Sequence, residues 1–274
     1  MQKRHFLHCL LAVFTLSAMA ATAAPANHVV RLSTTTSTEN SGLLSYLLPQ
    51  FQMDTGIRVH VIAVGTGKAL ELAKNGDVDV TLVHARPSED RFVAEGHGVN
   101  RRDVMYNDFI LVGPASDPAG IRGEKDILQA LKKIIAGNAR FISRADNSGT
   151  DQMEKSYWKQ IGSIPRGSAY IAAGRGMGDV LSMAAELDAY TLADRATYAT
   201  YRRKTGLALM VEGDRRMFNP YGIIAVNPAK HQGVNYRGAT ALIDWMTSPK
   251  GQEKITNFRQ DGEQLFHPSA IGPR

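Results

Sequence analysis

Four short segments of the chain are rich in serine, threonine and glycine, and each stands where an apolar run gives way to a helical pattern. They are residues 34–38, 65–68, 148–150 and 174–178. The free N–H groups of a first helical turn and the hydroxyl groups beside them are donors that together can bind an anion. Ser, Thr and Gly are also preferred N-cap residues, so capping alone explains any one segment. Four of them in one chain favour an oxyanion site.

One arginine stands just before the third segment. Arg144 belongs to the sequence SRADNSGT, residues 143–150, and precedes the expected helix start by one short turn. Its guanidinium offers a planar, charged fork of donors that matches an oxyanion. The alternative is a salt bridge from Arg144 to Asp146 or Asp151. The pattern R-x3-S-G-T therefore predicts an anion ligand, with an internal ion pair as the competing interpretation.

Alternating strand and helix patterns surround these segments. Apolar runs predict strands at 29–32, 57–64, 78–83, 109–112, 141–142 and 221–226. Apolar residues at helical spacing predict helices at 43–51, 68–74, 127–135, 150–161, 176–187, 239–246 and 252–258, the first of them kinked or restarted at Pro49. Buried strands joined by helices and short loops favour an open α/β sheet. Ligands of such sheets bind beyond the carboxyl ends of the strands, where all four segments fall.

Two lobes are the simplest arrangement of these elements. A new α/β series begins after Asp108, and the elements after residue 220 could pack back on the first unit. We therefore expect a signal peptide at 1–24, a first lobe at 25–110, an inserted second lobe at 111–219 and a return to the first lobe at 220–274. A single large sheet is the alternative, because periodicity says little about topology.

The first residues have the features of a secretory signal. Lys3 and Arg4 precede an apolar run over residues 9–20, which ends in small residues spaced for cleavage near residue 24. The run is shorter than the roughly 20 residues of a membrane-spanning helix. Cleavage would remove the one cysteine and two of the six excess positive charges. We therefore expect an exported, thiol-free protein that does not insert into a membrane.

Composition and missing motifs argue against several other functions. The 274 residues are 43% hydrophobic and 21% charged, as in an ordinary globular protein. The sequence has no G-x-S-x-G or H-E-x-x-H motif, and the glycines at 174–178 lack dinucleotide-binding spacing. Basic residues are scattered and do not interleave with aromatic ones, which disfavours a nucleic-acid partner. We expect a binding protein without a cofactor or metal site; an exported hydrolase is the less favoured alternative.

Several motifs resemble the tungstate-binding subunits of bacterial ABC importers. The most specific are TTTS at 34–37 and R-x3-S-G-T at 144–150, and the match spans roughly residues 29–226. The resemblance implies a two-lobed periplasmic binding fold of the second type, with mixed open sheets and helices on both faces. It also implies a periplasmic monomer that serves an ABC permease and ATPase and closes on its ligand, without enzymatic activity or a cofactor.

The resemblance also implies which residues hold the anion. Both lobes contribute ligands, namely Thr35, Thr36, Ser37, Thr66, Arg144, Ser148, Gly149 and Thr150, with Gly65 and His84 as further candidates. His84 is either a donor to the ligand or a structural histidine at a strand end. Arg86 is either a second charge near the cleft or a solvated loop residue, and Lys68 has no expected direct role.

Phosphate receptors of the same superfamily share R-x3-S-G-T but use an aspartate to accept a hydrogen bond from protonated phosphate. The corresponding segment here, residues 82–86, has no acid. This difference favours an anion that is fully deprotonated at neutral pH, such as tungstate, molybdate or sulfate. Tungstate itself is indicated by the resemblance, and molybdate, sulfate and phosphate remain the alternatives.

Overall fold

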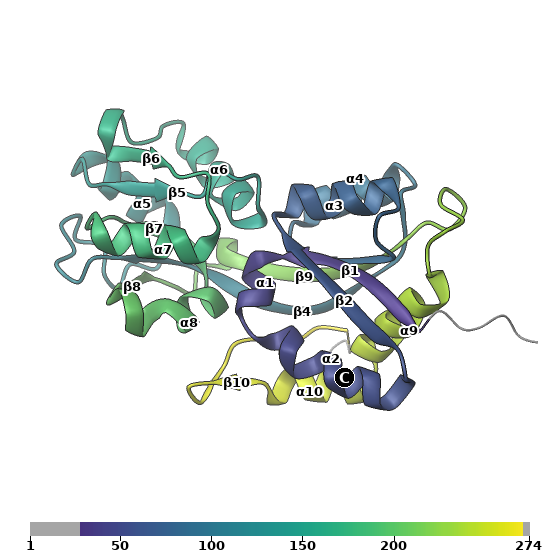
Figure 1. Ribbon diagram of the computed structural model, residues 1–274. Coiled ribbons are helices and arrows are strands. Elements are labelled where there is room, and N and C mark those ends of the chain that lie inside the picture. The colour runs from purple at the N-terminus through teal and green to yellow at the C-terminus, as the bar shows by residue number, and fades with distance from the viewer. Residues whose placement is uncertain (1–27, 271–274) are drawn as a thin grey trace, which may run out of the picture.

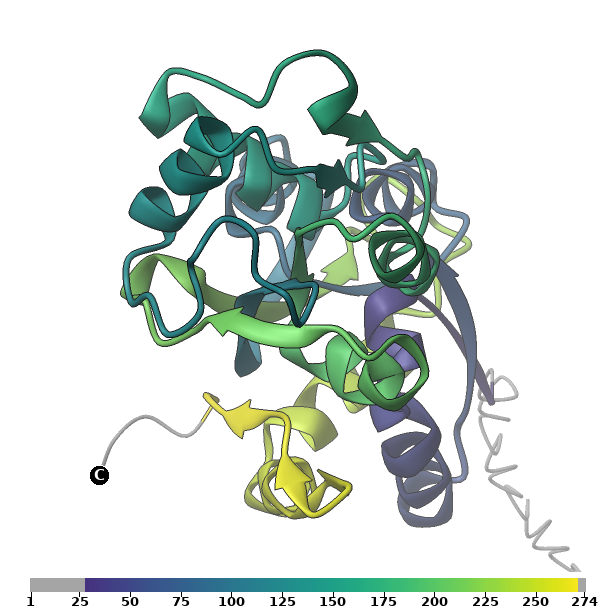
Figure 2. The same cartoon turned by 90° about the vertical axis from the view of Figure 1, so that its left-hand side faces the viewer.

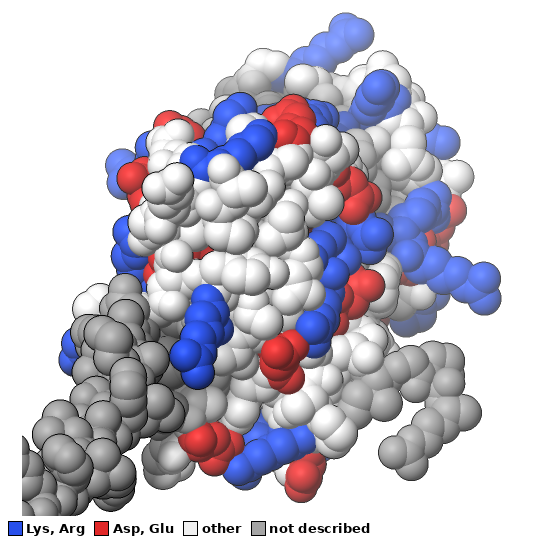
Figure 3. All heavy atoms as spheres, turned by 90° about the vertical axis from the view of Figure 1, so that its right-hand side faces the viewer, with Lys and Arg blue, Asp and Glu red and all other residues white. Residues whose placement is uncertain are grey.

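The computed structural model describes residues 28–270, so the predicted signal peptide lies outside the described residues. Figure 1 shows two lobes with two long strands running between them. None of the helices in this part of the chain is both long enough and apolar enough to span a membrane. On the face shown in Figure 3, basic and acidic side chains are interspersed rather than gathered by sign.

The first lobe is built on a six-stranded mixed sheet. Its order is β2-β1-β3-β9-β4-β12, with bounds Arg58–Val64, Val29–Thr35, Val80–Val83, Phe218–Val226, Gly98–Gly113 and His267–Pro268. The strand β1 is parallel to both of its neighbours, β2 and β3. The strands β9, β4 and β12 are each antiparallel to the preceding strand in this order. The carboxyl ends of β1, β2 and β3 therefore open on the same edge of the sheet.

Helices cover both faces of this sheet. One face packs against α2 (Leu43–Thr55), α9 (Tyr236–Thr247) and α10 (Pro249–Asn257), and the other against α3 (Thr66–Asn75) and α4 (Arg86–Ala94). The helix α2 forms as its spacing predicts, since Leu43, Leu44, Leu47 and Phe51 are all buried against the sheet.

The second lobe repeats this arrangement on a smaller scale. The end of β4 pairs with β7 (Thr191–Asp194) and β8 (Ala208–Val211), and β5 (Phe141–Ser143) pairs with β6 (Tyr170–Ala172). The helices α5 (Ile127–Ala136) and α6 (Gly149–Ile161) bury one apolar cluster. The helices α7 (Met177–Glu186) and α8 (Arg195–Thr205) border a second. Each lobe thus has helices on both faces and its own core.

Two strands carry the chain between the lobes. In β4, Asp108 pairs with Phe218 of β9, whereas the next residue, Phe109, pairs with Asp194 of β7. The first sheet therefore passes into the second through one continuous strand. Both sequence hypotheses describe part of this arrangement, because there are two lobes and yet their main sheets share β4.

Three sequence predictions need correction. The helix α2 continues through Pro49 without restarting, because its apolar face packs on the core on both sides of the proline. The strand predicted at 29–32 extends to Thr35 and runs directly into the short helix α1 (Thr36–Asn40), ahead of the first helix that the sequence predicted, at 43–51. The strand predicted at 109–112 begins at Gly98, because its first half lies beside β9.

Candidate functional site

The four segments singled out in the sequence meet between the lobes. The Gly149 N–H, at the start of α6, donates a hydrogen bond of 3.1 Å to Thr66 Oγ1, at the start of α3. A Cβ added to Gly65 would lie 3.4 Å from the Asp146 carbonyl oxygen, and one added to Gly176 would lie 3.9 Å from Thr36 Oγ1. The helix α1 also packs against α7 and α8, as Figures 1 and 2 show.

The end of β1 places a cluster of hydroxyl groups at this interlobe site. Thr35 caps α1 by accepting a hydrogen bond of 3.2 Å from the Thr38 N–H. Its Oγ1 lies 3.1 Å from Ser37 Oγ and 2.7 Å from Thr38 Oγ1. All three side chains are buried. Because hydroxyl groups both donate and accept, this cluster can turn its protons toward a ligand.

Arg144 enters the site from the second lobe and is 2% exposed. Its Nη2 forms an ion pair of 2.6 Å with Asp146 Oδ2, the internal pair that the sequence allowed. Its Nε and Nη1 are buried and have no hydrogen-bond partner within residues 28–270. A buried charged group rarely leaves donors unpaired. The ion pair therefore accounts for one arm of the guanidinium and leaves two donors for an anion.

The loop that carries Arg144 is held in a demanding conformation. Ala145 and Asn147 have φ angles of 49° and 58°, in the left-handed region that residues other than glycine seldom adopt. The Ser148 N–H donates to Asp146 Oδ1 at 3.1 Å, and the Asn147 N–H donates to Asp151 Oδ2 at 3.0 Å. These bonds fix the loop, and the strain is of the kind found at functional sites.

The start of α6 follows directly. Ser148 caps the helix by accepting from the Asp151 N–H at 3.2 Å. Thr150 Oγ1 is buried and has no hydrogen-bond partner in the described part of the chain, and the same holds for Thr36 Oγ1 at the start of α1. Unpaired donors from the two lobes thus belong to helix starts that meet between them.

His84 lies at the end of β3, beneath the hydroxyl cluster. Its Nε2 is 3.2 Å from Thr35 Oγ1 and 3.3 Å from Ser37 Oγ, and its Nδ1 is 2.9 Å from Asn219 Oδ1. Burial lowers the pKa of His84; nearby Asp194 opposes this shift and Arg144 adds to it. Sequence reasoning missed Asn219, because nothing near position 219 signals a partner 135 residues away.

Two further basic residues lie outside this cluster. Arg86 begins α4 instead of lying in a loop, because Pro87 and the cap at Ala85 start a helix there; its half-exposed side chain pairs with Asp90 at 2.7 Å. Lys68 is also half-exposed and pairs with Glu71 at 3.2 Å on its own helix.

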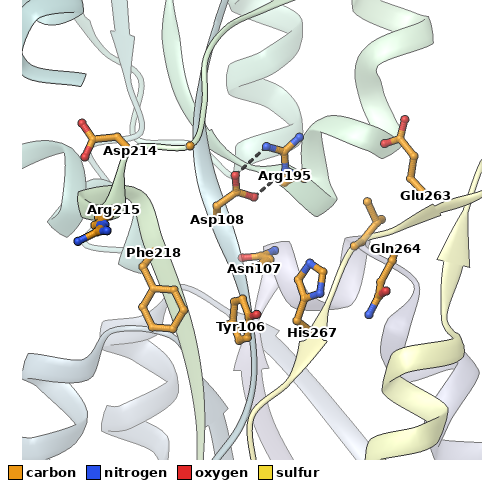
Figure 4. Close-up of a pocket in the computed structure, with 12 residues that line it drawn as sticks. Tyr106, Asn107, Asp108, Arg195, Asp214, Arg215, Phe218, Glu263, Gln264 and His267 are labelled. Carbon is orange, nitrogen blue, oxygen red and sulfur yellow. Dashed lines mark hydrogen bonds and ion pairs between the residues drawn. The ribbon is translucent and has the colours of Figure 1, made fainter. Parts of the chain in front are cut away.

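A larger cavity lies outside this cluster. It has a volume of about 520 Å³ and borders the crossing strands and the C-terminal segment. Figure 4 shows the ion pair of 2.6 Å between Asp108 and Arg195 at its edge. A smaller cavity of about 160 Å³ touches His84 and Gly149. Most of the candidate ligands line neither cavity, because the two lobes already touch around them.

The described residues contain no group of three or more His, Cys, Asp or Glu side chains arranged to hold a metal ion. The donors that meet between the lobes are hydroxyl, amide and guanidinium groups. Such a set suits a small oxyanion rather than a cation.

The chain matches the model of the PBP superfamily domain over residues 21–250 and belongs to that superfamily. The tungstate-binding protein TupA of Peptoclostridium acidaminophilum is 52% identical over 243 residues, which are 87% of this chain and 85% of that protein. The chain therefore belongs, within the superfamily, to the family that includes this protein.

Two solved structures are also similar. The tungstate ABC transporter structure from Geobacter sulfurreducens has a TM-score of 0.79 and 52% identity, and the match covers 84% of this chain and 98% of the chain in that structure. The tungstate-binding protein TupA from Desulfovibrio alaskensis G20 has a TM-score of 0.77 and 47% identity, and the match covers 89% of this chain and 99% of that protein's chain. These similarities confirm the two-lobed fold expected from the sequence.

Proposed function

We propose that this chain is a periplasmic solute receptor that binds tungstate between its lobes and delivers it to an ABC permease and its ATPase. The names of its relatives support both the ligand and the transporter. The predicted signal peptide supports the location. Because one chain supplies ligands from both lobes, we propose that the receptor acts as a monomer, without a cofactor or catalytic activity.

The observation that carries the proposal is a set of buried donors between the lobes that have no hydrogen-bond partner in the part of the chain that the structure describes. They are Arg144 Nε and Nη1, Thr36 Oγ1 and Thr150 Oγ1. Leaving a buried donor unpaired costs about 1–3 kcal/mol. An oxyanion among these groups would remove that cost and would meet a full positive charge on Arg144.

The remaining predicted ligands complete a donor shell. The hydroxyl groups of Ser37 and Thr66 come from the first lobe, where Thr35 supports Ser37 from the same hydroxyl cluster, and Ser148 and the start of α6 come from the second. Tungstate carries no proton at neutral pH and so needs donors only. The site's neutral hydroxyl and N–H groups, with one guanidinium, meet that need.

Isothermal titration calorimetry of the purified protein with tungstate, molybdate, sulfate and phosphate tests the ligand. We expect saturable binding of one tungstate per chain and no measurable heat with phosphate. Binding of phosphate without binding of tungstate would reject the proposal, and preference for molybdate or sulfate would assign the receptor to that anion. Light scattering of the same samples tests the monomer.

A further inference from the structure

The imidazole ring of His84 is held in one orientation by the residues around it. Its ring is 4% exposed and stacks on Tyr221, with 4.7 Å between ring centroids and 20° between planes. On the side of the second lobe it faces Gly149, where an added Cβ would lie 3.1 Å from His84 Nδ1. The imidazole is thus enclosed by β9 and by the first residue of α6, and its two nitrogens meet different partners.

The partner of Nδ1 is an amide on a crossing strand. Asn219 Oδ1 lies 2.9 Å from Nδ1, and Asn219 Nδ2 donates to Asn107 Oδ1 at 2.6 Å. Asn107 and Asn219 face each other across the β4–β9 ladder. An amide oxygen accepts hydrogen bonds and donates none, so with the Asn219 amide in this orientation we place the ring proton on Nδ1. Burial favours the neutral ring by lowering the pKa of His84, and Nε2 then has no proton.

The partners of Nε2 are hydroxyl groups that we assign to the anion site. Thr35 Oγ1 lies 3.2 Å from Nε2 and Ser37 Oγ lies 3.3 Å away. A nitrogen without a proton can accept from one of them but cannot donate to an anion. Thr35 Oγ1 accepts from the Thr38 N–H and lies 2.7 Å from Thr38 Oγ1, which can also donate to it, so the Thr35 proton is free to point at Nε2. The Ser37 proton then stays available for a ligand.

We propose that His84 is a positioning residue that acts as a neutral hydrogen-bond acceptor: it takes the Thr35 proton at Nε2 and thereby leaves the Ser37 hydroxyl to donate to the oxyanion. This assignment replaces both sequence alternatives, the donor to the ligand and the purely structural histidine. It also joins the hydroxyl cluster, through Asn219 and Asn107, to both strands that cross between the lobes. It rests on the proposed function, because it concerns the same site.

Two variants distinguish the roles of the two ring nitrogens of His84. His84→Asn keeps a donor near Nδ1 for Asn219 and removes the acceptor at Nε2, whereas His84→Gln keeps an acceptor near Nε2 and loses the bond to Asn219. We expect His84→Asn to weaken tungstate binding at least 10-fold with little change in the midpoint of urea unfolding. We expect His84→Gln to bind within about 3-fold of the wild type and to unfold at lower urea. A purely structural histidine would lower stability and affinity together.

Long-range ¹⁵N–¹H NMR of the wild-type protein, with and without tungstate, locates the ring proton. The signal of His84 is identified by its absence from the spectrum of His84→Asn. We expect the Nδ1–H form in both states. A proton on Nε2, or equal loss of affinity in the two variants, or no loss in His84→Asn, would overturn the positioning role while tungstate binding by the wild type stood. Failure of the wild type to bind any of the four oxyanions would overturn the proposed function as well.

Discussion

Arg144 combines an ion pair with free donors, and this combination prepares it for an anion. Asp146 holds one nitrogen of the guanidinium at 2.6 Å, which fixes the fork, while Nε and Nη1 have no hydrogen-bond partner among residues 28–270. A fixed side chain loses less conformational entropy when a ligand binds. Asp146 therefore orients Arg144 and still leaves it able to bind an anion.

We expect Arg144→Ala to weaken tungstate binding by about 10-fold to 100-fold, since a hydrogen bond to a charged group contributes about 1.5–3 kcal/mol. Calorimetry measures the change. Arg175→Ala is the matched control: this arginine is exposed, and it touches the same loop through its backbone N–H, 3.2 Å from the Arg144 carbonyl oxygen. If both variants bound tungstate like the wild type, Arg144 would be only the partner of Asp146.

Glu154 makes the stability of the protein depend on pH. Its carboxyl is 2% exposed and accepts from Trp158 Nε1 and from the Tyr170 hydroxyl, both at 2.8 Å. Burial raises its pKa from 4.5 to about 7. Between these two values the folded protein keeps a proton that the unfolded chain releases, so the free energy of unfolding falls as pH rises through this window.

Glu154→Gln removes this titration and keeps an oxygen to accept the two hydrogen bonds. Relative to the wild type, the variant should gain stability on the order of 2–3 kcal/mol between pH 5 and pH 8. Urea unfolding of both proteins at the two pH values measures the difference. The same pH dependence in both proteins would mean that Glu154 is ionised in the folded state.

Among the elements, Gly149 is where the start of α6 meets the first lobe. A Cβ on this residue would lie 2.8 Å from the His84 carbonyl oxygen, which is closer than real contacts allow. Alanine is otherwise favourable in a helix. We therefore expect Gly149→Ala to weaken tungstate binding at least 10-fold, because the lobes could not approach.

Gly176→Ala provides the control at the start of α7. Its added Cβ would lie 3.9 Å from Thr36 Oγ1, an ordinary contact, and its φ of −64° suits any residue. Binding within about 3-fold of the wild type is expected, measured by the same calorimetry. If the two glycine variants lost affinity equally, a clash with His84 would not be the cause.

The sequence predicted most elements, and the exceptions have physical reasons. Helix α2 could be predicted because its buried leucines recur at helical spacing. Helix α8 buries only Ala196, Thr197 and Ala199, so its sequence shows no apolar pattern of large side chains. The first half of β4 was missed because Arg101 and Arg102 interrupt its apolar pattern. Local periodicity detects large buried side chains on one face and little else.

The candidate site also has a part that the sequence could predict and a part that it could not. The hydroxyl-rich and glycine-rich segments at 34–38, 65–68 and 148–150 could be predicted because hydroxyls and glycines after a strand are local signals, but the helix that begins at Thr36 was not predicted. The link from His84 to Asn219 and Asn107 could not, because it depends on the register of two strands distant in the sequence. Whether the predicted ligands hold an anion stays a prediction.

At the scale of the whole molecule, two kinds of contact lie between the lobes. The ladder of β4 and β9 is continuous backbone pairing, with Asn107 opposite Asn219 and Asp108 opposite Phe218. The bond from the Gly149 N–H to Thr66 Oγ1 instead joins the free surfaces of the two lobes. Separation of the lobes would break the bond between Gly149 and Thr66 and could leave the β4–β9 ladder intact.

Hydrogen exchange of backbone amides distinguishes the two. We expect tungstate to slow exchange at Gly149, whose acceptor is in the other lobe, and to leave the pairs of the β4–β9 ladder at residues 105–108 nearly unchanged. Mass spectrometry with fragmentation near these positions gives the rates. Equal slowing in both places would mean that the strands themselves open when the ligand leaves.

The continuity of β4 also constrains how new proteins can be made from this one. One strand supplies a member of both main sheets, and its pairing changes from β9 to β7 between Asp108 and Phe109, so a cut there would remove one of the two strand connections between the lobes. A sensor built by inserting a reporter domain should therefore interrupt a surface loop of one lobe and leave this strand whole. Genetic exchange of lobes between relatives would have to carry the strand with one lobe and rebuild its pairing in the other.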